Sequence, residues 1–442
     1  MISVAKFGGS SLRDAFAFNK VFNILITNTN LKVIVLSAVG QVTDQLSEIL
    51  TAQVNNKKSI CNNIVQTHRQ IVEELGISSN KINDYLKALQ DEMMDLSNQQ
   101  PTFAIADQLL SIGERFSSRI MISLLEKNEV KSKLVPATDI IITDDCFTNA
   151  RPDINEIKIR CQDKIIPYLK DYTIITEGFI GSSKNNKKYI TTLGRGGSDI
   201  SAALIAEAII SDSLYIFTDV NGVYTVDPNI VKDSTLINQL NYERMLELAN
   251  LGASVLHPKA IVPCKRFNIP IVIKSTFSPE KEGTLICDKE KNYSFLTITH
   301  KKCQYMVESF EVDSNNLINF FDKYPINFDF IEWNDINRFF VYEVNKIFER
   351  KIYEELLNIK QIKIKKELEV VIIMADYLND FKNIITKYIK NSEFHIDIFQ
   401  CKNKLNTLYI IVANGVAEEF INFLYKFIKN NKEEILFNQE LF

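Results

Sequence analysis

Apolar residues in the first two thirds of the chain form short runs that alternate with longer amphipathic stretches. Five of these runs are almost wholly apolar and rich in β-branched residues: SVAKF (3–7), KVIVLSA (32–38), YTIITEGF (172–179), LYIFTDV (214–220) and IPIVIKS (269–275). Such runs are typical of strands that are buried on both faces. Helical periodicity at about 104–127 and 198–211 falls between them. The alternation predicts an α/β fold, with a mainly parallel sheet and helices on both faces.

The use of glycine changes near the polar run DKEKNYS (288–294). Thirteen of the fourteen glycines lie at or before Gly283, and only Gly415 lies beyond it. Because tight turns and close approach to a ligand favour glycine, we expect the binding chemistry in residues 1–290. Residues 291–442 are predicted to form a separate region.

That second region combines short strand patterns with amphipathic helices, predicted near 315–323, 378–390 and 417–429. The rhythm predicts two small βαββαβ-like α+β units. A single irregular α+β domain is the alternative.

The composition argues against several classes of function. The 442 residues carry a formal net charge of -4, which gives no reason to expect a nucleic acid partner. No run approaches the roughly 18 apolar residues of a membrane span. The first residues have a strand-like pattern and not the cationic and apolar regions of a signal peptide. We therefore expect a cytoplasmic location. Seven cysteines without CxxC spacing and four isolated histidines predict neither a disulfide framework nor a protein metal site.

The motif KFGGSS (6–11) follows the first predicted strand. Its paired glycines let backbone N–H groups approach phosphate oxygens, and the helix that follows presents its positive end. Lys6 supplies a point charge for a phosphate. The spacing differs from that of the Walker-type loop, in which the lysine comes after the last glycine. A plain turn is the alternative.

The motif TTLGRGGSD (191–199) directly precedes a predicted helix. Its three glycines make a loop that can wrap around an anion, and Ser198 can cap the helix. Arg195 can bind a carboxylate or phosphate through two N–H donors, and Asp199 can orient a cation. A simple turn would not need this combination of side chains.

A third motif, FTDVNGVYTVDP (217–228), joins the end of a predicted strand to two turn signals. Its backbone and Tyr224 could bind the base and ribose of a nucleotide, although a simple connection is the alternative.

Two weaker signals remain. In SIGERF (111–116), Glu114 could equally be an exposed ion-pair partner, and LGASVLHPKA (251–260) could simply begin a helix.

In their order and spacing, these segments resemble the aspartate kinases of the amino acid kinase family over nearly all of residues 2–290. LSAVGQVTD (36–44), TEGFIGS (176–182) and GTLI (283–286) match further blocks of that family. The tail resembles the paired ACT domains of the family by its rhythm rather than by its residues.

The resemblance implies roles for individual residues. Lys6 and Asp199 would be catalytic, with Asp199 orienting Lys6 and the metal–phosphate assembly. Glu114 would receive the α-ammonium group of aspartate and Arg195 its α-carboxylate. The implied substrate-binding residues are Ser37, Thr43, Glu114, Arg195 and Ser198. The implied nucleotide-binding residues are Lys6, Gly8, Gly9, Ser10, Thr218, Asp219, Tyr224 and Asp227.

The implied reaction transfers the γ-phosphoryl group of ATP to the side-chain carboxylate of L-aspartate, giving 4-phospho-L-aspartate. It would be the first step of the lysine, threonine and methionine (diaminopimelate) pathway. The attacking carboxylate has a pKa of about 3.9 and is ionised at neutral pH, so no general base is needed. ATP and Mg²⁺ are the implied cofactors, and Mg²⁺ is expected through the ATP phosphates.

The chain departs from the family pattern at a few positions. Ser10 stands where many relatives have threonine, which should matter little. Asn229 stands where an arginine is common, and Ser254 where some relatives have lysine. Both changes fall on the ATP side and affect the expected nucleotide affinity, and Lys259 could partly replace the lost charge.

Two other functions remain open from the sequence. A related enzyme acting on glutamate, carbamate or a nucleoside monophosphate would share the fold, but Glu114 and the complete TTLGRGGSD motif favour aspartate. A non-enzymatic amino-acid sensor would belong to another class, and the presence of both Lys6 and Asp199 favours an enzyme.

The tail combines an absence of glycine between Gly283 and Gly415 with a concentration of aromatic residues in its first part: Phe320, Phe321, Trp333, Phe339 and Phe340. Aromatic residues are enriched in cores and interfaces. ACT pairs often bind an effector at a glycine-containing loop. We therefore expect a homodimer formed through the C-terminal region, with feedback inhibition by lysine or threonine weak or absent.

Overall fold

The computed structural model describes residues 1–252, 255–289, 296–309, 314–322, 327–333, 336–343, 349–375, 385–389, 394, 396–400 and 407–430. The chain forms two compact units. Unit 1 comprises Met1–Val223, Asn238–Ala249 and Ser254–Glu290, and unit 2 comprises Tyr224–Ile237, Asn250–Ala253 and Lys291–Phe442. Two short segments from before residue 290 therefore cluster with the C-terminal part, whereas the sequence predicted two contiguous regions.

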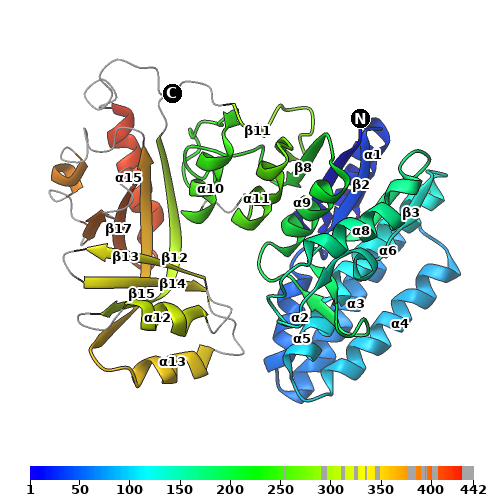
Figure 1. Ribbon diagram of the computed structural model, residues 1–442, viewed down its shortest axis with the longest axis horizontal. Helices are drawn as coiled ribbons and strands as arrows, with labels where there is room; N and C mark the ends of the chain where they lie inside the picture. The colour runs from blue at the N-terminus through cyan, green and yellow to red at the C-terminus, as the bar shows by residue number, and fades with distance from the viewer. Residues whose placement is uncertain are drawn as a thin grey trace. The chain divides into compact units, whose positions relative to one another are not determined.

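An eight-stranded sheet in the order β3-β5-β2-β1-β8-β10-β11-β9 forms the centre of unit 1 (Figure 1). Its strands are β1 (Ser3–Phe7), β2 (Leu31–Leu36), β3 (Ser132–Leu134), β5 (Thr173–Glu177), β8 (Ser213–Thr218), β9 (Gln239–Leu240), β10 (Ile271–Ser275) and β11 (Thr284–Ile286). From β3 to β10 neighbouring strands are parallel, and β11 is antiparallel to β10. The predicted parallel sheet is confirmed, and each of the five apolar runs contains one of its strands.

Helices cover both faces of this sheet. On one face lie η1 (Gly9–Leu12), α1 (Ala15–Thr27), α2 (Val42–Thr51), α3 (Val54–Glu74), α4 (Asn80–Ser97), α5 (Phe103–Leu110) and α6 (Ile112–Lys127), which share a core with Phe7, Ile34 and Ile175 of the strands. Against β1, β2 and β8 from the other side packs α9 (Gly197–Ile209), which is itself flanked by α8 (Ile154–Lys164) and α11 (Pro258–Arg266). Further helices are α7 (Ala137–Ile140), η2 (Ile166–Tyr168) and α10 (Tyr242–Asn250).

The predicted helix at 104–127 is divided at Ser111 into α5 and α6. The Ser111 hydroxyl donates a hydrogen bond to the carbonyl of Gln108, at 2.7 Å. A serine side chain bonded to a nearby carbonyl competes with the regular backbone hydrogen bonds of a helix. The apolar periodicity of the sequence therefore continues across the point where α5 ends and α6 begins.

A small second sheet of unit 1 contains β4 (Ile142–Thr143), β6 (Ile180–Ser183) and β7 (Ile190–Thr192). Strand β6 pairs in parallel with β4 and antiparallel with β7. Strands β6 and β7 come after β5 in the chain and lead to the start of α9. The glycine-rich segment 194–197 therefore lies between β7 and α9.

Unit 2 is built on one six-stranded antiparallel sheet, β13-β14-β12-β15-β17-β16 (Figure 1). Its elements are β12 (Leu296–Ser309), α12 (Ser314–Asp322), β13 (Asn327–Trp333), β14 (Ile336–Glu343), α13 (Glu349–Leu357), β15 (Ile362–Ala375), β16 (Asp397–Gln400), β17 (Thr407–Ala413) and α15 (Ala417–Asn430). One core lies beneath α12 and α13, and a second lies beneath α15.

The central strands β12 and β15, each of 14 residues, contribute to both cores of unit 2. The prediction of two small α+β units is therefore confirmed, with the difference that they share one continuous sheet. Helix α13 and the first half of β12 were not predicted from the sequence. The helix predicted at 378–390 lies mostly outside the described residues, and 385–389 of it is helical.

Four of the five aromatic residues singled out in the tail have described side chains. Phe321, Phe339 and Phe340 are fully buried, and Phe320 packs partly buried against the same core as Phe321 and Phe339. The expectation that they form core is confirmed for these four; the side chain of Trp333 lies outside the described atoms. Within the described part of the chain, no helix combines the length and apolar character needed to cross a membrane.

Replacing Phe321 by alanine should destabilise unit 2 by about 3–5 kcal/mol, because the ring is fully enclosed in a core that relaxes only partly around a cavity. Trp333 is the single tryptophan of the chain and lies on β13, so urea unfolding followed by its fluorescence reports on unit 2.

The matched control is Phe330→Ala, because Phe330 is 36% exposed and packs against Phe339 in a tilted arrangement at a centroid distance of 4.9 Å. Its loss should cost about 1 kcal/mol. Equal shifts in the two variants would contradict the packing around Phe321.

Candidate functional site

An ion pair between Lys6 and Asp199 lies at the carboxyl end of β1. Lys6 comes from β1 itself and Asp199 from the first turn of α9, and Nζ and Oδ1 are 2.7 Å apart. The two side chains are only 14% and 11% exposed. A carboxylate in the first turn of a helix is also favoured by the helix dipole. The structure therefore brings together the two residues predicted to be catalytic.

His257 completes the surroundings of Asp199. Its backbone N–H donates to Asp199 Oδ2 at 3.3 Å, while its own Nδ1 accepts from the N–H of Lys259 and caps α11. Burial lowers the pKa of His257 to about 4, so the ring is neutral at physiological pH. LGASVLHPKA does begin a helix, as the simpler interpretation predicted. The sequence offered no signal that its histidine would lie beside Asp199.

Gly196 allows α9 to begin where it does. Its φ is +66°, a left-handed conformation that favours glycine, and a Cβ atom at this position would lie 2.3 Å from Cβ of His257. Gly196 is also the residue that precedes the first turn of α9, without a side-chain cap. Ser198 lies inside that turn and does not cap the helix, contrary to the sequence prediction.

The loop after β1 is held tightly at its glycines. A Cβ atom at Gly9 would lie 2.7 Å from the carbonyl oxygen of Gly40, so the backbone approach there requires glycine. The N–H of Gly8 donates to the carbonyl of Phe217 at 3.2 Å and is thus not directed at a ligand, which differs from its expected role. The N–H groups of Gly9 and Ser10 begin η1 and need partners from outside the helix.

Glu114 on α6 is buried, not exposed as the simpler interpretation allowed. It is 2% exposed, and its Oε1 accepts from the N–H of Ala38, just after β2, at 3.3 Å. Its Oε2 is buried without a hydrogen-bond partner. Burial raises the pKa of Glu114 to about 8, and the charge of Glu177 adds to the rise. A buried carboxyl oxygen without a partner is costly unless a cation or donor reaches it.

Two predicted substrate residues lie on segments that contact α6. Ser37 follows β2, and its carbonyl accepts from the hydroxyl of Ser117 on α6 at 2.6 Å. A Cβ atom at Gly113 would lie 2.7 Å from Cβ of Ala38, so α6 packs directly on this segment. Thr43 is half-buried in the first turn of α2.

Arg195 is exposed on the loop between β7 and α9. The preceding Gly194 has φ of +74°, and a Cβ atom there would lie 3.0 Å from Oδ1 of Asn149. That same oxygen accepts from Nζ of Lys259 at 3.4 Å, so Lys259 lies beside the glycine-rich loop.

Two further buried acids stand close to this loop and were missed by the sequence analysis. Asp107 on α5 accepts hydrogen bonds from Thr148 and Thr192, and burial raises its pKa to about 7. Glu177 at the end of β5 accepts from the hydroxyl of Ser118 at 2.9 Å and from the N–H of Ala137 at 2.7 Å, and burial raises its pKa as well. Both acids are internal hydrogen-bond acceptors, and only burial, which sequence patterns do not reveal, distinguishes them.

The expected nucleotide residues divide between the two units. Thr218 ends β8 in unit 1 and Asp219 follows it; the Thr218 hydroxyl donates to Asp219 Oδ1 at 3.1 Å. Tyr224 and Asp227 belong to unit 2, where Asp227 Oδ1 accepts from the N–H of Asn229 at 2.8 Å. Ser254, another position of interest for the nucleotide, lies outside the described residues.

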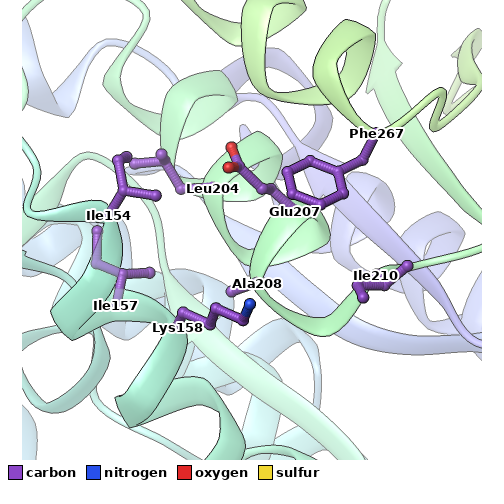
Figure 2. Close-up of a pocket in the computed structure, with 8 residues that line it drawn as sticks. All are labelled: Ile154, Ile157, Lys158, Leu204, Glu207, Ala208, Ile210 and Phe267. Atoms are coloured by element: carbon purple, nitrogen blue, oxygen red, sulfur yellow. The ribbon is translucent and has the colours of Figure 1, made fainter.

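A small apolar groove also occurs in unit 1, between α8, α9 and the end of α11 (Figure 2). It contains none of the predicted site residues. Its acid, Glu207, already accepts a hydrogen bond from Arg266 Nη1 at 2.8 Å. Glu207 lies eight residues along α9 from Asp199, about 12 Å away at the helical rise of roughly 1.5 Å per residue. We therefore place the candidate site around Lys6, not in this groove.

The arrangement combines groups of opposite charge at the ends of neighbouring strands. Lys6 and the first turn of η1 can receive an anion beyond β1. Glu114 can receive a cation against the end of β2, which pairs directly with β1. Ligands of parallel α/β sheets bind beyond these carboxyl ends. No group of three or more potential metal-binding side chains occurs in the described part of the chain.

Comparisons with known proteins find related sequences over much of the chain. The chain is 33% identical over 294 residues to lysine-sensitive aspartokinase 3 of Escherichia coli, covering 66% of this chain and 65% of the relative. It is 38% identical over 285 residues to an aspartokinase of Chlamydia muridarum, covering 64% and 63% of the two chains. The match thus spans just under two thirds of the length of these curated relatives.

Solved structures extend the likeness over almost the whole chain. E. coli aspartokinase III in complex with aspartate and ADP has a TM-score of 0.86 at 25% identity, covering 99% of this chain and all 100% of that one. Clostridium acetobutylicum aspartate kinase has a TM-score of 0.70 at 27% identity, covering 96% and 99%. The C-terminal sheet is consistent with the predicted ACT-like units. The sequence profile of the amino acid kinase family matches residues 1–275, and this chain therefore belongs to the amino acid kinase family.

Proposed function

We propose that this protein is an ATP-dependent aspartate kinase, which converts L-aspartate and ATP to 4-phospho-L-aspartate and ADP. The observation that carries the proposal is the placement of the Lys6 ammonium group at the end of β1 and of the Glu114 carboxyl group, on α6, against the end of the adjacent strand β2. A substrate with an ammonium group and a carboxylate to be phosphorylated fits both. The likeness to E. coli aspartokinase III with bound aspartate and ADP supports the same assignment.

Recognition of aspartate rests on both ends of the amino acid. Glu114 receives the α-ammonium group, which supplies the missing partner of its buried Oε2. Arg195 receives the α-carboxylate through its forked N–H donors. Ser37, Thr43 and Ser198 line the pocket for the amino acid.

Phosphoryl transfer requires positioning and neutralisation of charge, with little covalent chemistry for the protein to perform. Lys6 stabilises the developing negative charge of the γ-phosphoryl group, together with the N–H groups of Gly9 and Ser10. Asp199 holds the Lys6 ammonium group at 2.7 Å and fixes its direction. The aspartate carboxylate attacks in its ionised form, so the neutral His257 is not needed as a base.

Mg²⁺ fits this site through the phosphates of ATP. Both oxygens of Asp199 are engaged, by Lys6 and by the N–H of His257, and the described residues offer no cluster of acids. Bound to the phosphates, the ion would neutralise their charge and aid departure of ADP.

The nucleotide is held at the carboxyl end of β8, through Thr218 and Asp219. Asn229 is exposed where an arginine would add a phosphate contact, so the affinity for ATP should be modest. The product, an acyl phosphate, would feed the synthesis of lysine, threonine and methionine in the cytoplasm. Residues 291–442 form an ACT-like regulatory or dimerising region, through which we propose a homodimer.

The direct test is release of ADP by the purified full chain, measured with ATP, Mg²⁺ and a panel of acidic metabolites. Aspartate should give the highest kcat/KM, above glutamate, carbamate and nucleoside monophosphates. Turnover of another member of the panel in preference to aspartate would contradict the proposed substrate.

Replacing Lys6 by alanine should lower kcat by about 10²-fold or more, since one preorganised charge is typically worth about 3 kcal/mol in a transition state. Steady-state kinetics with saturating aspartate and ATP measure this effect. Lys184→Ala is the control, because that lysine is 58% exposed and pairs only with Asp153 among the described ion pairs. A Lys6 variant with near-normal kcat would remove this residue from the mechanism.

The pH dependence of aspartate binding should follow Glu114. Its pKa of about 8 leaves the carboxyl group mostly protonated in the free protein at neutral pH, and only the ionised form can pair with an ammonium group. The KM for aspartate should therefore fall up to about tenfold per pH unit as the pH rises toward 8, and level off above it.

Glu114→Gln removes the titrating group, so the KM for aspartate should be raised and nearly constant over the same range, while the KM for ATP is spared. A change confined to the KM for ATP would show that Glu114 acts on the nucleotide and not on aspartate.

Truncation after residue 290 should abolish the dimer and lower thermal stability. Val226 and Val231 are buried in the core beneath α15, and the truncated chain would expose them. Light scattering after size exclusion, together with thermal melts, compares the two chains at equal concentration. A full chain that is monomeric would refute the interface.

Lysine and threonine, singly and together, should inhibit the full chain weakly or not at all. Strong inhibition by lysine or threonine below millimolar concentrations would reveal an effector site in a tail that has no glycine between Gly283 and Gly415.

A further inference from the structure

Asp107 is a buried acid that the proposed mechanism does not use. It lies on α5, is 0% exposed, and accepts four hydrogen bonds from only two residues. The N–H of Thr148 bonds both oxygens, at 3.0 Å to Oδ1 and 2.9 Å to Oδ2. The N–H of Thr192 bonds Oδ2 at 2.9 Å, and its hydroxyl bonds Oδ1 at 2.7 Å. The carboxylate thus joins two segments that are 44 residues apart in the sequence.

The first of these segments is a turn in a restricted conformation. Thr148 has φ of +69°, which is uncommon for a residue other than glycine and is retained when the surroundings enforce it. The turn is also paired with β7, since the N–H of Ala150 donates to the carbonyl of Thr192 at 2.8 Å. Asp107 therefore holds both sides of this junction, which consists of the turn at Thr148–Ala150 and the end of β7 at Thr192.

The junction directly supports the loop that carries Arg195. A Cβ atom at Gly194 would lie 3.0 Å from Asn149 Oδ1 and 3.1 Å from the carbonyl oxygen of Thr148, so the loop rests on the turn without room for a side chain. Thr192 is three residues before Arg195 and is itself held by Asp107. A shift of the turn or of Thr192 would displace the guanidinium group.

A carboxylate suits this position better than a neutral side chain does. Three donors converge on it, the N–H groups of Thr148 and Thr192 and the hydroxyl of Thr192, and a carboxylate offers an acceptor oxygen to each of them. An amide would place an N–H₂ group against one of the backbone N–H donors. Burial raises the pKa of Asp107 to about 7, while the hydrogen bonds from Thr148 and Thr192 act in the opposite direction.

We propose that Asp107 is a positioning residue for substrate recognition, which sets the Arg195 loop for the α-carboxylate of the amino acid. This rests on the proposed function, because Arg195 is the carboxylate-binding residue only if the protein is an aspartate kinase. Asp107 does not touch the substrate, and its effect passes through Thr148, Thr192 and Gly194.

The test compares Asp107→Asn with the full-length wild type in steady-state kinetics. The KM for aspartate should rise about 10–100-fold while kcat and the KM for ATP change less than about threefold, since a small misplacement of a binding group can cost about 10²-fold. Asp153→Asn is the matched control: Asp153 caps α8 and pairs with Lys184, and is not part of the Arg195 loop. That control should lose stability without a selective rise in the KM for aspartate.

A second readout does not depend on activity. The N–H of Gly197 donates to the carbonyl of Gly194 at 3.0 Å, so its hydrogen exchange reports on closure of the loop. Exchange at Gly197 should be faster in Asp107→Asn than in Asp153→Asn. If the wild type does not phosphorylate aspartate, the proposed function fails, and this measurement still decides whether Asp107 holds the loop.

Thr192→Val serves if Asp107→Asn does not fold, because it removes only the hydroxyl donor and should raise the KM for aspartate by a smaller factor in the same direction. An active wild type together with an unchanged KM for aspartate and unchanged exchange at Gly197 in the folded variants would overturn the inference. A fall in kcat with no change in KM would do so too.

Discussion

The close ion pair between Lys6 and Asp199 is the constraint on which the site depends. A lysine at the end of a buried strand and an aspartate in the first turn of a helix can meet at 2.7 Å only if α9 begins directly beyond the sheet. Gly196 makes this possible, because its left-handed backbone and missing side chain let the helix start against His257. The pair offsets the cost of burying each charge and holds the ammonium group where an anion would bind.

Three buried acids, Asp107, Glu114 and Glu177, differ in how the free-energy cost of burying a carboxyl group is offset. Asp107 is held by three donors and Glu177 by a hydroxyl and an N–H, whereas Glu114 has one oxygen without a partner. A carboxylate satisfied by the protein organises structure, and one left unsatisfied is suited to a ligand. This difference separates Asp107 and Glu177, which hold the scaffold, from Glu114, which can receive a cation.

Unit 2 shows that the regions predicted from sequence are not separate in the fold. The segment Tyr224–Ile237 shares its core: Val226 forms a parallel bridge with Ile298 of β12, and the hydroxyl of Tyr425 donates to the carbonyl of Asp233 at 2.9 Å. A segment expected to contact the nucleotide is thus stabilised by α15. The two cores of the unit are likewise joined, because β12 and β15 pass through both.

The sequence by itself determined the parallel sheet, the strand end that carries Lys6, and the glycines on which the loops of Lys6 and Arg195 depend. These features are local, since an apolar run or a glycine cluster acts on its own neighbours in the chain. It did not reveal Asp107, His257 or the break at Ser111, nor the placement of Tyr224 in unit 2. Asp107 meets Thr192 across 85 residues, and no periodicity records which buried acid will find donors. Only the tertiary structure decides such partners, because burial and hydrogen bonding between distant segments arise when the chain is folded.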